Sequence, residues 1–387
     1  MPRPLTIAYV TVEDAADKRS WSGSLFFLAR ALRAEGHTVI PIGPLRPQPV
    51  LFLCRLFNRI TLRLLGKRFH YRDSFILSKA YARIIQRRLL GVKADLILAP
   101  AGLSAIAHLR TPLPIIHFND RSVAGAVEYH AILKDLFDWS REQSLALERL
   151  ALRNAALTVY ASDWAAKGAR TSCPEAANKV VVIPMGANLE EAPPAPAPRD
   201  FPPETIDLLF IGVHWENKGG PIAVDALREL GKRGVNARLV VCGCDVPADI
   251  RDGNIVREGF LSKSDPAQGA LLEEHLRTAD FLVLPTRFEA YGIAFCEAAA
   301  YGIPVLGTRT GGVPTIVQEG ETGYLFDLKD GGTAYADRIA QLIGDPQAWQ
   351  VMRQAARKRY EQVLTWEVFV KALVAQVESA RPVKSER

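Results

Sequence analysis

Short apolar runs of strand length alternate with amphipathic helical patterns through both halves of this chain. In the first half, helical patterns cover residues 22–35 and 140–154, and the apolar runs occupy residues 5–12, 38–43, 95–100, 114–118, 156–161 and 180–184. In the second half, helical patterns begin near residues 221, 267 and 293, and the apolar runs occupy residues 206–212, 238–243, 281–285 and 304–307. Strands that alternate with helices build parallel sheets. The pattern therefore predicts an α/β protein with doubly wound parallel sheets.

A proline-rich segment, EAPPAPAPRDFPPE, separates the two series of strands and helices. Prolines exclude a helix interior and a central strand, so we expect a linker over residues 191–205. A chain of 387 residues is also too long for one ordinary hydrophobic core. We therefore expect one domain over residues 1–190 and a second over residues 206–364. Ligands of open parallel sheets bind beyond the carboxyl ends of the strands, so the loops there are the candidate site.

The composition is that of a globular protein, with 48% apolar and 23% charged residues. No uninterrupted apolar run reaches the ~18 residues of a spanning helix. The first apolar run leads directly into Glu13 and Asp14, which indicates a buried strand and not a signal peptide. The five cysteines are sparse and odd in number, which favours a reduced, cytoplasmic protein. Cys242 and Cys244 have no second cluster of metal ligands nearby, so we expect no metal site there.

Positive charge is concentrated between residues 51 and 93. This segment holds eleven Lys or Arg residues and a single acid, Asp73, which gives it a net charge of +10 in a chain of net charge +6. Arg55, Arg59 and Arg63 recur every four residues among Leu, Phe and Ile, a basic amphipathic helix pattern. Two interpretations remain open: docking onto an anionic membrane surface or an acidic acceptor, or a solvated helix face. Nucleic-acid binding is disfavoured because no interleaved aromatic platform accompanies the charge.

Two glutamates, Glu289 and Glu297, have seven residues between them and flank a predicted helix start at Gly292. Positive helix ends and their free N–H groups hold phosphates, and here those amides belong to Gly292, Ile293 and Ala294. Carboxylates accept hydrogen bonds from sugar hydroxyls. A glycine at the helix start also permits close approach of a phosphate. The combination predicts a pocket for a nucleotide sugar.

The stretch RFEAYGIAFCEAAAYGIPVLGTRTGGVPTIV, residues 287–317, resembles the retaining glycosyltransferases of family 4, the glycosyl transferases group 1, which carry an E-x7-E motif. The resemblance implies the GT-B fold, in which two Rossmann-like doubly wound parallel-sheet domains face each other across a cleft. It also implies that a helix near residues 365–385 packs back on the first domain. By the same resemblance, Glu297 binds the ribose hydroxyls of the nucleotide and Glu289 meets the donor sugar.

The loop after the strand at 206–212 reads VHWENKGG, where the family has a glycine, an arginine and then lysine-glycine. Gly212 and Lys218 match the family pattern, and Lys218 is expected to bind the diphosphate and to act in catalysis. The arginine position is occupied by Val213, so one cation is missing from its usual place. His214 or Arg309 could replace it, and the residues leave that choice open.

Three candidates lie in the first half of the chain. The family has a glycine-rich loop after its first strand, and the WSGS loop of this chain keeps only Gly23 as a phosphate contact. The strand at 114–118 runs into HFNDR, where His117 and Asp120 are expected at the strand end and in the cleft. Relatives contact the donor sugar or position the acceptor from this place. The sequence does not choose between His117 and Asp120.

The resemblance implies transfer of a sugar, of hexosyl type, from a UDP-, GDP- or ADP-linked donor to a hydroxyl of a glycan or lipid-linked acceptor, with the anomeric configuration retained. Glycan, lipopolysaccharide or glycolipid biosynthesis would be the setting, in the cytoplasm or at the inner membrane face. No D-x-D triplet occurs, and we expect neither a metal ion nor another cofactor.

Two other functions remain open: a GT-B epimerase of nucleotide sugars, and a non-catalytic carbohydrate- or lipid-binding protein. A dinucleotide oxidoreductase is disfavoured because no G-x-G-x-x-G follows the first strand.

Overall fold

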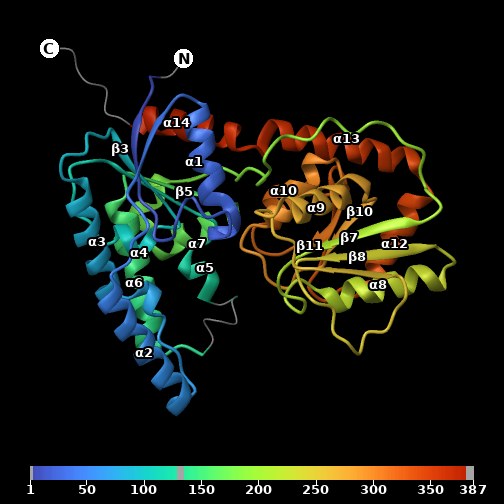
Figure 1. Ribbon diagram of the computed structural model, residues 1–387, viewed down its shortest axis with the longest axis horizontal. Helices are drawn as coiled ribbons and strands as arrows, with labels where there is room; N and C mark the ends of the chain where they lie inside the picture. The colour runs from blue at the N-terminus through green and yellow to red at the C-terminus, as the bar shows by residue number, and fades with distance from the viewer. Residues whose placement is uncertain (1–2, 128, 130–134, 381–387) are drawn as a thin grey trace. The chain divides into compact units, whose positions relative to one another are not determined.

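The computed structural model describes residues 3–127, 129 and 135–380 of the chain (Figure 1). It divides into two compact units, which are described here one at a time. Unit 1 comprises Met1–Pro184 together with Trp366–Arg387, and unit 2 comprises Met185–Thr365. The boundary lies before the proline-rich segment, so residues 191–205 belong to unit 2 in this division.

Unit 1 is built on a six-stranded parallel sheet with the order β2-β1-β3-β4-β5-β6. Its strands are β1 (Thr6–Tyr9), β2 (Thr38–Pro41), β3 (Leu96–Pro100), β4 (Ile115–Asn119), β5 (Leu157–Tyr160) and β6 (Val180–Val182). Its α-helices are α1 (Ser24–Ala34), α2 (Gln48–Leu65), α3 (Phe75–Leu89), α4 (Leu103–Ile106), α5 (Val123–Val127), α6 (Asp138–Asn154), α7 (Asp163–Ser172) and α14 (Trp366–Ala380). The doubly wound sheet predicted for this half is confirmed.

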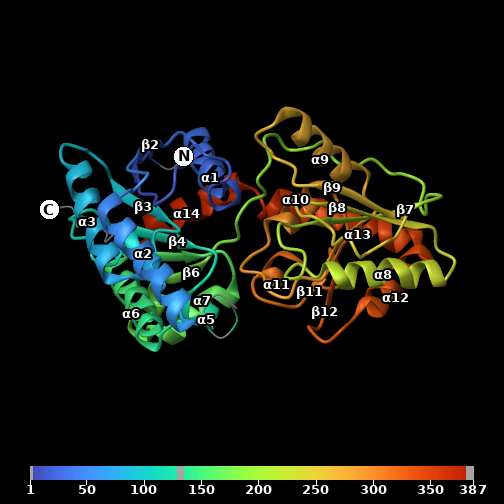
Figure 2. The same cartoon turned by 60° about the horizontal axis from the view of Figure 1, so that its bottom comes forward.

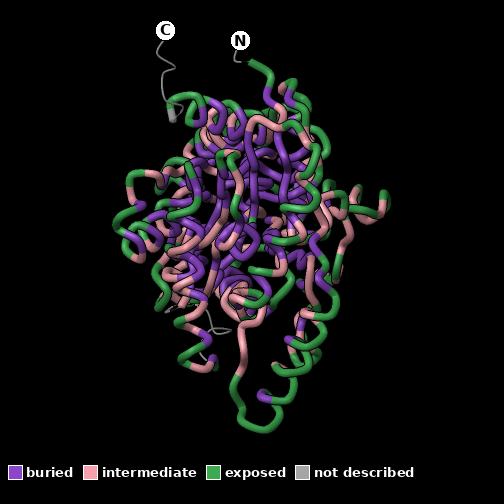
Figure 3. The backbone as a smooth tube through the Cα atoms, turned by 90° about the vertical axis from the view of Figure 1, so that its left-hand side faces the viewer, coloured by how far each residue is buried: buried purple, intermediate pink, exposed green. Residues whose placement is uncertain are grey.

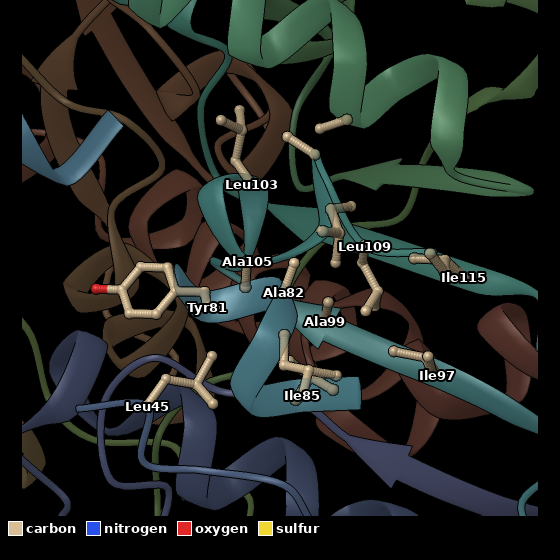
Figure 4. Close-up of a cluster of buried hydrophobic side chains, with 14 of the residues drawn as sticks. Leu45, Tyr81, Ala82, Ile85, Ile97, Ala99, Leu103, Ala105, Leu109 and Ile115 are labelled. Atoms are coloured by element: carbon tan, nitrogen blue, oxygen red, sulfur yellow. The ribbon is translucent and has the colours of Figure 1, made fainter. Parts of the chain in front are cut away.

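Alternate residues of the central strands supply cores on the two faces of this sheet, because successive strand side chains point to opposite sides. Ile97 and Ala99 of β3 pack with Tyr81 and Ile85 of α3 in one buried cluster (Figure 4). Phe118 of β4 instead points to the face that α14 covers. Its ring centre lies 4.6 Å from that of Phe369 in α14. Helix α14 also packs on α1, although the whole of unit 2 lies between these two helices in the sequence.

Unit 2 carries a second six-stranded parallel sheet with the order β12-β11-β10-β7-β8-β9. Its strands are β7 (Ile206–Ile211), β8 (Ala237–Cys242), β9 (Ile255–Gly259), β10 (Phe281–Leu284), β11 (Val305–Thr308) and β12 (Gly323–Phe326). Its α-helices are α8 (Gly220–Lys232), α9 (Pro266–Thr278), α10 (Ile293–Ala300), α11 (Val313–Ile316), α12 (Gly332–Ile343) and α13 (Pro346–Val363). Helices α8 and α12 lie side by side (Figure 2). The edge strands β9 and β12 were not predicted.

The proline-rich segment packs against α13 and is not a free connection. The ring of Phe201 stacks on that of Trp349, with 3.8 Å between the ring centres. Arg353 donates a hydrogen bond to the carbonyl of Ala197 at 3.1 Å, and Arg357 donates one to the carbonyl of Pro193 at 2.7 Å. A segment that is neither helix nor strand leaves its backbone carbonyls without regular partners, and arginines of α13 satisfy two of them here.

Candidate functional site

The strand order of unit 2 creates a switch point between β7 and β10. These two strands are neighbours, but the chain continues from β7 to β8 on one side and from β10 to β11 on the other. The loops that follow such strands separate and leave a crevice where ligands of doubly wound sheets bind. Lys218 lies in the loop after β7, and Glu289 lies in the loop after β10. The structure therefore brings these two predicted residues to the switch point.

Lys218 and Glu289 form an ion pair, in which the ammonium donates a hydrogen bond to Oε2 of the carboxylate. Both side chains are mostly buried, with 18% and 11% of their surfaces exposed. Two glycines position the lysine. A Cβ at Gly212 would come within 2.6 Å of Lys218 Cγ. Gly219 has a φ of +78°, and a Cβ there would lie 2.1 Å from the carbonyl oxygen of Pro285.

Glu297 lies in the second turn of α10, as predicted, and is buried with 3% of its side chain exposed. Gly292 precedes the helix with a φ of +107°, and a Cβ there would overlap the ring of Phe295 at 2.4 Å. No side-chain hydrogen bond caps the helix at this residue. First-turn N–H groups lack acceptors within their own helix, so Ile293 and Ala294 present donors at a positive helix end.

The partner of Glu297 is Lys263, a residue that the sequence analysis missed. Its ammonium donates to Oε1 of Glu297 and also to the carbonyl of Asn188, at 3.2 Å for the carbonyl. Lys263 follows β9, whose sequence IVREG contains only two apolar residues and gave no strand signal. Without that strand, nothing in the sequence placed Lys263 at the same sheet edge as Glu297.

The position that carries arginine in the family is exposed here. Val213, which occupies this position, has 57% of its surface exposed. Arg309, one suggested replacement, forms an ion pair with Glu319 at 2.8 Å and also donates to the carbonyl of Leu325. These contacts hold Arg309 in the β11–β12 region of unit 2. His214, the other suggested replacement, contacts Lys218 through its backbone: its carbonyl accepts a hydrogen bond from the Lys218 amide at 2.9 Å.

In unit 1 the structure brings the WSGS loop and Asp120 together. Asp120 follows the end of β4, and one of its carboxylate oxygens accepts a hydrogen bond from Trp21 Nε1 at 3.1 Å. Trp21, Ser22 and Gly23 all have positive φ, at 47°, 55° and 91°. Non-glycine residues adopt this conformation at a cost and are concentrated at functional sites. The helix predicted from residue 22 begins at Ser24 because of this turn.

His117 does not lie at the end of its strand, and this prediction was wrong. Strand β4 continues to Asn119, so His117 is inside the sheet, where it pairs with Ala99 and Thr158 and has no exposed surface. Its Nδ1 donates to the carbonyl of Ala99 at 3.2 Å, since a carbonyl can only accept. Nε2 is buried with no partner among the described residues. Burial lowers the pKa of His117 from 6.5 to about 4.

Within the described ranges, the structure has neither a candidate metal centre nor a membrane-spanning helix. No three His, Cys, Asp or Glu side chains in residues 3–127, 129 and 135–380 are placed to hold a metal ion. None of the helices in the same ranges combines the length and the apolar character that crossing a bilayer requires.

Both units match known families. Residues 24–191 match the family described as Glycosyltransferase Family 4, and residues 205–345 match Glycosyl transferases group 1. Among curated proteins, N-acetyl-alpha-D-glucosaminyl L-malate synthase of Bacillus anthracis is 35% identical over 135 residues, which are 33% of this chain and 34% of the relative. D-inositol 3-phosphate glycosyltransferase of Corynebacterium efficiens is 34% identical over 160 residues, 38% of this chain and 37% of the relative. A putative colanic acid biosynthesis glycosyltransferase, WcaL, of Escherichia coli is 27% identical and extends over 56% and 54%. The chain thus spans between a third and about half of these relatives' length.

Solved structures share the fold over nearly the whole chain. Sucrose-phosphate synthase from Thermosynechococcus elongatus has a TM-score of 0.65 at 18% identity, covering 98% of this chain and all of that one. HepE of Anabaena, in complex with UDP and glucose, has a TM-score of 0.63 at 15% identity and covers 97% of this chain and all of its own. The fold prediction is confirmed. This chain belongs to the group 1 glycosyltransferases of family 4 and has their GT-B fold.

Proposed function

We propose that this protein transfers a hexosyl group from a nucleotide-sugar donor to a hydroxyl of a glycan or lipid-linked acceptor and retains the anomeric configuration. The observation that carries the proposal is the pair of lysine–glutamate ion pairs, each with a buried glutamate, at the carboxyl edge of the unit 2 sheet. Anionic diphosphates need cations and helix amides, and sugar hydroxyls need carboxylates. Glycosyltransferase names among the relatives, and the UDP-glucose complex of HepE, support a nucleotide-sugar donor here.

Lys218 has the place and the charge to bind the diphosphate. An ammonium has three N–H donors, so Lys218 can hold Glu289 and a phosphate oxygen at the same time. The amides of Ile293 and Ala294 would bind the same anion at the positive end of α10. Glu289 would accept hydrogen bonds from hydroxyls of the donor sugar, because its carboxylate stands beside the phosphate-binding lysine at the switch point.

Glu297 would bind the ribose hydroxyls, and Lys263 would act as its positioning residue. A carboxylate that is 3% exposed needs a partner, because an unpaired buried charge is strongly unfavourable. Lys263 provides that partner and, through its second hydrogen bond to Asn188, is itself fixed in direction. Glu297 is thereby held in one orientation before a nucleotide arrives.

In the proposed reaction, the bond between the anomeric carbon and the diphosphate oxygen breaks while the acceptor oxygen attacks from the same face. The acceptor proton passes to the departing phosphate oxygen, and the products are a glycoside and a nucleoside diphosphate. Lys218 and the α10 amides meet negative charge that grows on the leaving group, so they stabilise the transition state more than the bound donor. The proposed reaction uses no metal ion and no further cofactor.

Acceptor-dependent release of nucleoside diphosphate tests the proposal. The full chain is first screened by thermal shift against UDP-, GDP- and ADP-sugars, since a bound donor raises apparent stability. The best donor is then assayed with glycan and glycolipid acceptors, and NMR of the product reports the anomeric configuration. Lys218→Ala should lower kcat about 100-fold or more, whereas Glu297→Ala should mainly raise the Kd for the donor.

Lys232→Ala is a matched control, because Lys232 pairs with Glu229 on the exposed side of α8 in the same unit. Equal kinetics for Lys218→Ala and this control would remove the site assignment. An isomerised donor formed without acceptor would indicate an epimerase, and donor binding without diphosphate release would indicate a non-catalytic binding protein. A product of inverted configuration would reject retention alone.

We also propose a reducing compartment, the cytoplasm, as the place of reaction. All five cysteines are free, and four of them are buried. Disulfides are rare in cytosolic proteins and common in exported ones, so free thiols support this location.

A further inference from the structure

Helix α2 exposes most of its large apolar side chains. Among the described residues, fifteen large hydrophobic side chains are exposed, and eight of them belong to this one helix. They are Phe52, Leu53, Leu56, Phe57, Ile60, Leu62, Leu64 and Leu65. Only Cys54 and Thr61 are buried within the helix. Exposed apolar residues are normally scattered singly, so a cluster of this size indicates a surface that something else covers.

These apolar side chains form a continuous stripe. Leu56, Phe57, Ile60 and Leu64 follow Leu53 by three, four, seven and eleven residues, which is the spacing of one helix face. Cys54 and Thr61 lie seven residues apart on another face, which is the one that unit 1 buries. In Figure 1 the C-terminal end of α2 extends beyond the rest of unit 1, and the corresponding lowest segment in Figure 3 is almost entirely exposed.

A row of arginines borders the stripe. Arg55, Arg59 and Arg63 recur every four residues, and the 18-residue helix contains no acidic residue. None of the three arginines forms an ion pair with a described acid. These three arginines belong to the basic segment 51–93, whose net charge is +10. A stripe of Leu, Ile and Phe beside a row of arginines matches the boundary between lipid acyl chains and anionic headgroups.

Aromatic rings extend this surface at the end of α2. The ring centre of Phe69 lies 5.6 Å from that of Phe57 in the helix and 5.1 Å from that of Trp139. Trp139 is 48% exposed and stacks on Phe137 at 5.6 Å. Lys67 Nζ lies 6.0 Å from the centre of the Phe137 ring. Half-exposed tryptophans next to basic residues are typical of side chains at the level of lipid headgroups.

We propose that α2 lies in the plane of an anionic membrane surface, with its apolar stripe among the acyl chains and its arginines at the headgroups. Insertion across the bilayer is not compatible with the helix, because none of the described helices can span one. A second copy of the chain is a poor occupant. Two-fold pairing of α2 would set one arginine row against the other, and like charges at close range repel. This inference stands independently of the sugar-transfer proposal.

Flotation of the full chain with vesicles tests the proposal. Vesicles of phosphatidylcholine with about 30% phosphatidylglycerol should carry the protein, and pure phosphatidylcholine should carry far less, because basic residues interact with the anionic surface. Raising the salt concentration should weaken the binding. Changing Arg55, Arg59 and Arg63 together to Glu should lower partitioning about 100-fold or more, because three attractions to the anionic surface are replaced by three repulsions.

A second variant separates insertion from simple electrostatic attraction. Leu56→Ser with Ile60→Ser should lower binding while leaving the charge unchanged. Val351→Ser is its matched control, because Val351 is an exposed apolar residue of α13 in unit 2, at 57%. A fluorophore on Leu56→Cys, introduced together with Cys244→Ser because Cys244 is the one native thiol that is not buried, should show the blue-shifted emission of an apolar environment when vesicles are added. Circular dichroism of every variant should match the parent protein.

Unchanged partitioning of the arginine or the serine variants, with their folds intact, would overturn the proposal. A dimer in solution that the Leu56→Ser and Ile60→Ser changes convert to a monomer would also overturn it, because a second copy would then cover the stripe. Loss of donor turnover alone would leave the membrane result unaffected, so the two proposals can fail separately.

Discussion

Acidification should reveal whether His117 belongs to the core of unit 1 or to a catalytic site. The folded protein holds His117 with a pKa of about 4, lowered from 6.5 by burial among β3, β4 and β5. A lowered pKa means that folding favours the neutral ring. The stabilisation is therefore complete above pH 6.5 and is lost as the pH falls from 6.5 toward 4.

The size of the effect follows from the two pKa values. At about pH 5, an unfolded chain would protonate nearly every His117 ring, whereas the folded protein would protonate only about one in ten. The difference lowers the free energy of unfolding by about 2 kcal/mol relative to about pH 7. Protonation would also place a second N–H donor, on Nε2, in a position where no described residue accepts it.

NMR of protein labelled in its histidine rings measures this pKa directly. The resonance that disappears in His117→Phe identifies the ring among the seven histidines. Its chemical shift should stay constant from about pH 8 to about pH 5 and change only near pH 4, and acid unfolding of the variant should require a lower pH. A midpoint near the ordinary value of 6.5 would refute the reasoning. It would mean that the ring reaches solvent, and His117 would return as a candidate base.

Three further perturbations test the geometry of unit 2. Gly219→Ala should lower the free energy of unfolding by about 1–3 kcal/mol, because its φ is positive and a Cβ would meet the Pro285 carbonyl; an unchanged denaturation midpoint would contradict the turn described here. Tyr291→Phe removes the hydrogen bond that its hydroxyl donates to the Met185 carbonyl and should lower stability by about 1 kcal/mol, measured by the same denaturation. Titration with a thiol reagent should modify one cysteine quickly, Cys244, because the other four are buried; rapid reaction of several thiols would show that unit cores open easily.

The sequence predicted all six strands of the unit 1 sheet and the four inner strands of the unit 2 sheet, and it missed the two edge strands of unit 2. The inner strands are mostly buried and apolar: β10 reads FLVL, and β7 reads IDLLFI with a single acid. The edge strands β9 and β12 have one neighbour each and a mixed composition, so no apolar run marks them. The proline-rich segment was read correctly as neither helix nor strand. Its stacking on Trp349 depends on side chains of α13 that lie about 150 residues further along the chain, which no local pattern reports.

The site shows the same division between local and distant information. The placement of Glu297 in the second turn of α10 followed from the helix start at Gly292, a local signal. The contact of Lys218 with Glu289 required the pairing of β7 with β10, which lie more than 70 residues apart in the chain. The strand before Asp120 was expected to end at residue 118, but β4 continues to Asn119, so His117 lies inside the sheet. An apolar run does not show where a strand ends.

Helix α14 has a consequence for how the polypeptide matures on the ribosome. Phe369 and Val370 of this helix are fully buried in unit 1, yet they follow the whole of unit 2 in the order of translation. Unit 2 can complete its fold during synthesis, whereas unit 1 must wait with the α14-facing side of its sheet uncovered. Ribosome-bound intermediates of this protein should therefore expose apolar surface in the part made first, and a nascent chain halted before residue 366 should bind chaperones through unit 1.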